Sequence, residues 1–163
     1  MRDEGGKSPL LVASMSVHCD VVKCLLSTSA DINLRDEVGH SPLSVASQQR
    51  LCDVVKCLLC SGADINLRNI LGQSPLFVAS QQGRCNVKCL LSSGADINLS
   101  DKYRQSPLFV ASQRGRCNVV KCLLSSGADI NLSDKFGQSP LSVEHHNNDA
   151  AMLLNVYFVL VQI

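Results

Sequence analysis

Short apolar stretches alternate with polar ones along the chain, and the segment from Ser106 to Gln138 shows the pattern clearly. A serine followed by a proline favours a helix start, because the serine oxygen caps the helix and the proline ring fits its first turn. Apolar residues then recur at helical spacing, first after Pro107 and again at Val119, Val120, Leu123 and Leu124. Gly127 is expected to end the second helix. The segment therefore predicts helix, turn, helix and a projecting hairpin-like loop over 129–138.

The same pattern occurs five times along the chain. The tripeptide Ser-Pro-Leu recurs at intervals of 33, 33, 32 and 33 residues, at Ser8, Ser41, Ser74, Ser106 and Ser139. A period in the thirties is typical of a solenoid, in which each unit buries its apolar face against its neighbours. The sequence therefore predicts a single domain over 1–163, with repeats at about 3–35, 36–68, 69–100, 101–133 and 134–163.

The repeated frame is D-x-x-G-x-S-P-L-x-x-A, then V-V-K-x-L-L, then G-A-D-I-N. It resembles the ankyrin repeat, whose hallmark is T-P-L-H-x-A in a unit of about 33 residues. The resemblance extends from residue 3 to about residue 157. It implies an all-α repeat solenoid of helix-turn-helix-hairpin loop units stacked in a curved array. It also implies a non-catalytic protein that binds another protein through its concave face, made of hairpin turns and first helices.

Two departures from this frame affect local stability. Arg104 replaces the turn glycine of repeat four, which we expect to cost about 1 kcal/mol if a positive φ is needed there. Repeat three lacks one residue of its second helix, since it reads Cys85-Asn-Val-Lys where repeat four has two valines. We expect Asn86 to take a normally apolar position, and amide exchange to be fastest in this helix. The histidine of the family hallmark is also absent, replaced by Leu11, Ser44, Phe77, Phe109 and Ser142.

The two ends of the array lack a polar cap. Glu144 replaces the small alanine in repeat five, and the apolar run Ala150–Ile163 forms its expected second helix. This run is shorter than the roughly 20 residues of a membrane span. Because terminal repeats usually show a polar outer face to water, we expect continuation into a longer array or self-association through this end.

Nine cysteines recur on the predicted second helices, for example Cys117 and Cys122. Cysteines five apart on a helix lie about 140° apart around its axis, so they are poorly placed to share a metal ion. Equivalent cysteines in successive repeats should lie about 8–10 Å apart, beyond the roughly 7 Å between Cα atoms that a disulfide tolerates. We therefore expect the cysteines to pack in the core. A thiol-based metal or redox protein, with the lone Cys57-Leu-Leu-Cys60 motif as its weak signal, is the alternative.

No enzyme motif accompanies the repeats. The aspartates that recur once per unit (Asp31, Asp64, Asp96, Asp129) are typical of a structural turn rather than of paired catalytic carboxylates. We expect no enzymatic activity, no metal and no cofactor. The formal net charge of +1 gives no case for nucleic-acid or membrane binding. The N-terminus lacks an apolar signal core, which favours a cytoplasmic protein, with the nucleus as an alternative.

The positions that vary between repeats are the candidates for binding a partner, because scaffold positions must repeat. Large apolar or aromatic residues at turn tips are unusual and favour an interface. The candidates are Val38, His40, Gln48, Gln49, Leu71, Gln73, Gln81, Gln82, Lys102, Tyr103, Gln105, Gln113, Arg114, Lys135 and Phe136. The alternative is that Tyr103 and Phe136 pack on the adjacent finger, and that the chain is a structural spacer within a longer array.

Charge is uneven along the array. Between residues 69 and 140 there are eight basic and four acidic residues: Arg84, Lys88, Lys102, Arg104, Arg114, Arg116, Lys121 and Lys135 against Asp96, Asp101, Asp129 and Asp134. This balance suggests an acidic partner segment, although an ordinary solvated surface explains it equally well.

Overall fold

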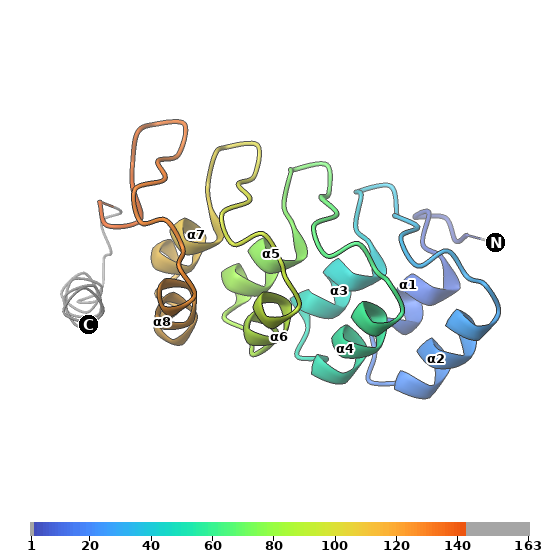
Figure 1. Ribbon diagram of the computed structural model, residues 1–163. Helices are drawn as coiled ribbons and strands as arrows, with labels where there is room; N and C mark the ends of the chain where they lie inside the picture. The colour runs from blue at the N-terminus through green and yellow to red at the C-terminus, as the bar shows by residue number, and fades with distance from the viewer. Residues whose placement is uncertain (1, 143–163) are drawn as a thin grey trace.

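The computed structural model describes residues 2–142, and over that range it contains eight helices and no strand. The helices are α1 (Pro9–Ala13), α2 (Cys19–Ser27), α3 (Pro42–Gln48), α4 (Cys52–Cys60), α5 (Pro75–Gln82), α6 (Asn86–Ser92), α7 (Pro107–Gln113) and α8 (Cys117–Ser125). They form four antiparallel pairs stacked in a row, and a hairpin-like loop, here called a finger, projects beside each pair (Figure 1). The predicted all-α repeat solenoid is confirmed.

Each first helix begins at the predicted serine. The hydroxyl oxygens of Ser8, Ser41, Ser74 and Ser106 accept a hydrogen bond from the backbone N–H three residues later, over 3.1 to 3.2 Å. This bond pairs one of the N–H groups that a helix start leaves without a partner, and the proline that follows has none to pair. The same four serines therefore fix where the first helix of each of these repeats begins.

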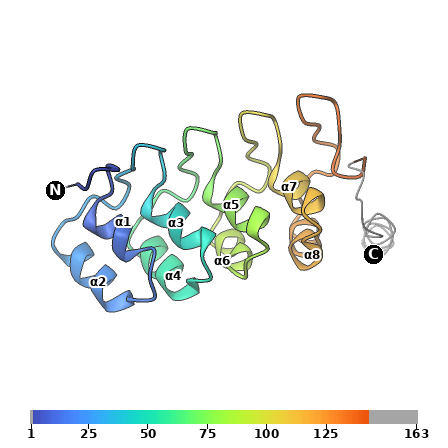
Figure 2. The same ribbon diagram turned by 180° about the vertical axis from the view of Figure 1, so that it is seen from behind.

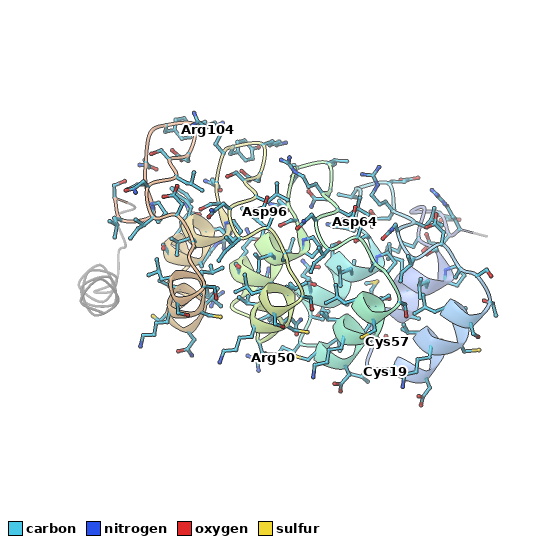
Figure 3. All side chains as sticks on the ribbon, in the orientation of Figure 1. Cys19, Arg50, Cys57, Asp64, Asp96 and Arg104 are labelled. Atoms are coloured by element: carbon cyan, nitrogen blue, oxygen red, sulfur yellow. The ribbon has the colours of Figure 1, made fainter. Side chains whose placement is uncertain are left out.

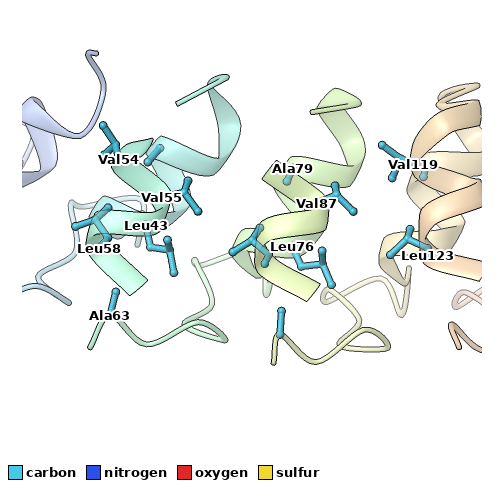
Figure 4. Packing of buried hydrophobic residues seen from close by; sticks show 14 of the residues in the cluster. Leu43, Val54, Val55, Leu58, Ala63, Leu76, Ala79, Val87, Val119 and Leu123 are labelled. Atoms are coloured by element: carbon cyan, nitrogen blue, oxygen red, sulfur yellow. The ribbon is translucent and has the colours of Figure 1, made fainter. Parts of the chain in front are cut away.

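The core runs along the stack in two layers. The first helices α1, α3, α5 and α7 pack on one another, and the second helices α2, α4, α6 and α8 form the other layer (Figure 2). Repeats one to four each contribute the leucine of Ser-Pro-Leu at 0 to 1% exposure: Leu10, Leu43, Leu76 and Leu108. Figure 4 shows Leu43 and Leu76 of the first helices beside Val55 and Val87 of the second helices. Full burial of such a side chain contributes about 1.5–3 kcal/mol.

The Ala-Asp-Ile-Asn segments join one repeat to the next. Asp64 Oδ1 accepts a bond from the N–H of Asn66, and Asn66 Oδ1 accepts one from the N–H of Asp96 in the following repeat, both over 3.0 Å. The pattern repeats from Asn33 to Asp64 and from Asn98 to Asp129. Figure 3 shows Asp64 and Asp96 at corresponding points of successive loops. The prediction that these aspartates serve structural turns is confirmed.

Repeat three absorbs its missing residue at the start of its second helix. α6 has seven residues, whereas α4 and α8 have nine. Asn86 stands where Val54 and Val119 lie in the neighbouring repeats, and it is 0% exposed. The prediction that this asparagine takes an apolar position is confirmed. Faster amide exchange in α6 stays a prediction.

Arg104 occupies the left-handed region, with φ of 63°. The glycines at the same place in other fingers have φ of 73° to 81°, at Gly6, Gly39, Gly72 and Gly137. The backbone position therefore needs a positive φ, as the sequence suggested. In Figure 3, Arg104 lies at the tip of its finger.

The predictions for Glu144 and for the apolar run at 150–163 lie outside the described residues. None of the helices between residues 2 and 142 has the length and apolar character to span a membrane.

Candidate functional site

The fingers of repeats two to five are each built on one buried or half-buried polar side chain, whereas Asp3, which holds the first finger, is exposed. Asp101 Oδ1 accepts bonds from the N–H groups of Tyr103 and Gln105, at 2.8 and 3.0 Å. Asp36, Asn69 and Asp134 hold their fingers through the same pair of bonds. A side-chain oxygen that binds the backbone two residues ahead mimics a turn. This anchor presents the third residue of each finger at the tip.

Adjacent fingers are tied by one backbone bond at each junction. The carbonyl oxygens of Gly5, Val38, Leu71 and Tyr103 accept bonds from the N–H groups of Glu37, Ile70, Lys102 and Lys135, over 2.9 to 3.3 Å. The acceptors are the tip residues themselves. The tips are therefore held in a row, at fixed spacing, by main-chain contacts that do not depend on the identity of their side chains.

Most of the tip side chains remain open to solvent. Val38 is 44% exposed, Tyr103 is 38% and Phe136 is 75%, whereas Leu71 is half-buried. Ile70, beside Leu71, is 65% exposed and extends the row. Ile70 is not among the candidates that the sequence indicated.

The two aromatic tips share one ammonium group. Lys135 Nζ lies 4.4 Å from the centre of the Tyr103 ring and 4.9 Å from the centre of the Phe136 ring. Lys102 Nζ lies 5.1 Å from the Tyr103 ring. These distances are within the range of a cation–π contact. Lys135 thus contacts the Tyr103 ring of the adjacent finger as well as the Phe136 ring beside it, and both rings keep exposed surface.

The charges at these two tips differ in accessibility. Lys102, Arg104 and Lys135 are exposed, whereas Asp101 and Asp134 are 5% and 3% exposed and are occupied by backbone N–H groups. A molecule approaching the finger tips of repeats four and five, at Tyr103 and Phe136, therefore meets basic and aromatic groups first.

The remaining candidate binding residues fall into two groups, one exposed and one half-buried. Gln48, Gln49, Gln113 and Arg114 are exposed at the ends of first helices, whereas Gln81 and Gln82 are half-buried. His40, Gln73 and Gln105 are half-buried inside their fingers. The side chain of His40 contacts Asp36 Oδ2 at 3.3 Å, and Gln73 Oε1 accepts a bond from Asn69 Nδ2. These two side chains support the fingers more than they face outward.

The chain matches the family described as ankyrin repeats (3 copies) over residues 1–69 and again over residues 43–134. Together these matches cover most of the sequence and the described helix pairs. The chain belongs to the ankyrin-repeat family. Ankyrin repeats are generally protein–protein interaction modules and are typically non-catalytic. A search of curated proteins finds none that matches this chain.

The expectation that the cysteines pack in the core is confirmed only in part in this ankyrin stack, because none of the nine is fully buried. Cys24, Cys60 and Cys85 are exposed, and the other six are half-buried. Cys19, Cys57, Cys89 and Cys122 pack against the rim of the core along the second helices. Figure 3 shows Cys19 and Cys57 on that side, away from the fingers. The apolar positions of these helices are filled by valine and leucine instead.

Burial raises the pKa of the Cys57, Cys89 and Cys122 thiols above the ordinary value, and a lysine on a second helix partly offsets this in each case. Such thiols stay protonated at neutral pH and are poor nucleophiles. Within residues 2–142, no group of three or more His, Cys, Asp or Glu is placed to hold a metal ion.

A correction concerns one pair of cysteines. Cys52 Sγ and Cys85 Sγ, on successive ankyrin repeats, lie 2.9 Å apart. The prediction that equivalent cysteines stay out of reach is therefore wrong for this pair. The shortened start of α6 breaks the regular spacing on which that prediction depended.

A hollow of about 390 Å³ lies between repeats one and two, lined by Lys23, Leu26, Ala30 and Cys57 among others. Its lining also includes Ser27 and Ser61, so a lysine and two serines lie among apolar side chains.

Proposed function

We propose that this ankyrin-repeat chain is a non-catalytic binding module whose partner docks on the row of fingertips and the adjoining ends of the first helices. The observation that carries the proposal is the ammonium of Lys135 lying between the exposed rings of Tyr103 and Phe136. Exposed aromatic and basic residues held in fixed positions are the kind of anchor that dominates binding energy in protein interfaces. The backbone bonds between fingers reduce the conformational entropy that binding would otherwise cost.

The charge of the tips favours an acidic segment of a partner protein. Lys102, Arg104 and Lys135 are exposed there, and the nearby aspartates are occupied by the backbone. A partner carboxylate near Lys135 would gain a charged contact while its neighbouring apolar groups cover the two rings. Because the tips are solvent-exposed, such binding should weaken as salt is added.

A pull-down from cell lysate tests this proposal. The chain is compared with a Tyr103→Ala/Phe136→Ala variant, which removes two exposed rings without touching the core. A matched control, Lys56→Ala/Lys121→Ala, removes two exposed side chains from second helices on the side away from the fingers. Loss of a partner from the first variant alone supports the fingertip site. Equal capture by all three proteins would place the site elsewhere, and capture by none would favour the spacer function.

The spacer function is the second candidate, and the open face of repeat one favours it. Val12 and Val21 are 47% and 48% exposed, whereas their equivalents Val45 and Val54 in repeat two are 7% and 1% exposed. In the inner repeats these positions are covered by the preceding repeat. Repeat one therefore presents an apolar face of the kind that stacks on another ankyrin repeat.

A further inference from the structure

The Cys52–Cys85 contact joins two repeats at a single point. Cys52 is the first residue of α4, and Cys85 immediately precedes α6. Their Sγ atoms are 2.9 Å apart, and both residues are free thiols. A disulfide has an S–S bond of about 2.05 Å, so an approach of about 0.9 Å would form one.

The missing residue of repeat three explains why this pair meets. In repeat four, Cys117 begins α8 and its Sγ contacts the carbonyl oxygen of Gly115 at 3.6 Å. In repeat three, Cys85 lies before the helix instead of inside it, because Asn86 has taken the place of a valine. Over residues 2–142, this is the one pair of cysteines whose sulfur atoms make a hydrogen-bond contact.

Asn86 holds both thiols in place. Its Oδ1 accepts a bond from Cys52 Sγ at 2.8 Å and lies 3.7 Å from Cys85 Sγ. Its Nδ2 is shared among the carbonyl oxygens of Ala46, Ser47 and Gln49, at 3.2, 3.3 and 2.6 Å. An amide anchored on its nitrogen to the end of α3 has a fixed oxygen. The two sulfur atoms therefore meet in a site whose geometry is determined by hydrogen bonds.

We propose that Cys52 and Cys85 form a thiol pair that hydrogen peroxide converts into a disulfide between repeats two and three. The crosslink would tie α4 to the start of α6, beside the end of α3 that Asn86 already holds. Reduction by a thiol would reverse it. The binding function proposed for the fingertips does not enter this inference.

Of this pair, Cys85 is exposed and Cys52 is half-buried, so peroxide reaches Cys85 first. Its thiolate attacks one oxygen, so that an S–O bond forms, the O–O bond breaks and hydroxide leaves as water after gaining a proton. The Cys52 sulfur then attacks the sulfenic sulfur of Cys85. An S–S bond forms, and the hydroxide that departs takes the proton of Cys52 as a second water. Two thiols and one peroxide thus give one disulfide and two waters.

Cys52 is suited to the second step, in which its sulfur attacks the sulfenic sulfur of Cys85. Burial, together with its contact with Cys85, raises its pKa to about 11, so it remains a thiol at neutral pH. A protonated, half-buried thiol reacts slowly with peroxide but is positioned to attack a neighbour that has become electrophilic.

Trypsin gives this proposal a direct readout, because cleavage at Arg50, Lys56, Arg84 and Lys88 leaves one cysteine in each of two short peptides, LCDVVK and CNVK. The reduced protein is treated with hydrogen peroxide below the total thiol concentration, the remaining thiols are alkylated, and the digest is analysed by mass spectrometry. We expect the linked pair LCDVVK–CNVK to be the dominant disulfide, with its loss after treatment with a reducing thiol.

Three controls sharpen the test. Inserting a valine after Val87 restores the repeat-four sequence, and this variant should fail to form the corresponding linked pair, LCDVVK–CNVVK, while remaining folded by circular dichroism. In Cys52→Ser, the sulfenic acid on Cys85 should persist and be trapped by dimedone. The urea-unfolded wild type should give mixed pairings. A native protein whose Cys85 is oxidised without the linked peptide, or which pairs as randomly as the unfolded chain, would overturn the proposal.

Discussion

Between residues 2 and 142, two side chains occupy backbone positions that favour glycine. Ser29 has φ of 61° and Arg104 has φ of 63°. Ser29 follows the end of α2 at the place where α4 and α8 are followed by Gly62 and Gly127. After α4, the N–H of Ala63 donates to the carbonyl of Leu58 and closes the helix end. The corresponding bond from Ala30 is missing at the end of α2. Ser29 and Arg104 therefore have a strained backbone conformation at positive φ, which glycine would adopt at lower cost.

Replacing either residue by glycine should stabilise the fold. Because an L-side chain at positive φ costs about 1 kcal/mol, Ser29→Gly and Arg104→Gly should each raise the free energy of unfolding by about that amount, measured by urea denaturation. The two sites lie far apart, so the double variant should show the sum of the two effects. Gly62→Ser is the reverse control: its added Cβ would meet no atom within 4 Å, so it should cost backbone strain alone. Unchanged midpoints in all variants would contradict the argument.

Single residues were the most predictable part of the fold when they had a local role. The serine caps, the turn aspartates and the strained Arg104 all act through the backbone within a few residues, and the sequence alone indicates such roles. The cysteines were not predictable in the same way. Their exposure depends on how far each second helix is rotated against its neighbour, and that rotation is set by packing between repeats.

At the scale of elements, α6 differs from the other second helices. It is two residues shorter than α4 and α8, and it begins with a buried asparagine in place of a valine. Asn86 offsets this by donating to the last carbonyls of α3, which have no partner within their own helix. The sequence predicted the apolar position of Asn86. It did not predict these bonds, because their acceptors lie about one repeat earlier in the chain.

Removing the Asn86 amide should destabilise the protein. In Asn86→Ala the carbonyls of α3 and the thiol of Cys52 lose their buried partner, so we expect a loss of about 1–3 kcal/mol in the free energy of unfolding. The matched control is Asn118→Ala, which changes the asparagine of the equivalent CNV sequence in repeat four. Asn118 is exposed, and the change should stay within about 0.5 kcal/mol. Chemical denaturation measures both, and equal effects would show that Asn86 contributes nothing beyond an exposed residue.

At the scale of the molecule, the stack is a chain of similar junctions. Each junction consists of stacked leucines and valines, one asparagine bond between loops and one backbone bond between fingers. The period of the sequence predicted this arrangement, since each unit must bury the same face. The sequence also predicted which residues form the row of tips. The lysine shared by two rings was not predicted, because Tyr103 and Lys135 lie in different repeats.

The open face of repeat one leads to a prediction for the whole molecule. Because Val12 and Val21 occupy positions that are covered in the inner repeats, we expect the chain to self-associate at high concentration in analytical ultracentrifugation. Val12→Gln/Val21→Lys should shift it towards the monomer without loss of helix content, since both side chains are about half exposed. Met15→Gln/Val17→Arg is the matched control: it changes two exposed apolar residues to those at the equivalent positions of repeat two, Gln48 and Arg50, which are exposed there. A monomeric wild type at every concentration would exclude self-association through this face.

Repeat three shows how a repeat protein can tolerate the loss of one residue from a helix. In a protein with one central core, losing a residue from a helix displaces everything that follows. Here the finger bond from Lys102 to Leu71 and the next one from Lys135 to Tyr103 are both 2.9 Å long, so the register is regained within a single repeat. The effect of the missing residue is confined to the junction of repeats two and three, where it brings two thiols within reach of one another. In a repeat protein, the loss of one residue can therefore bring reactive groups together at one junction without changing the other junctions.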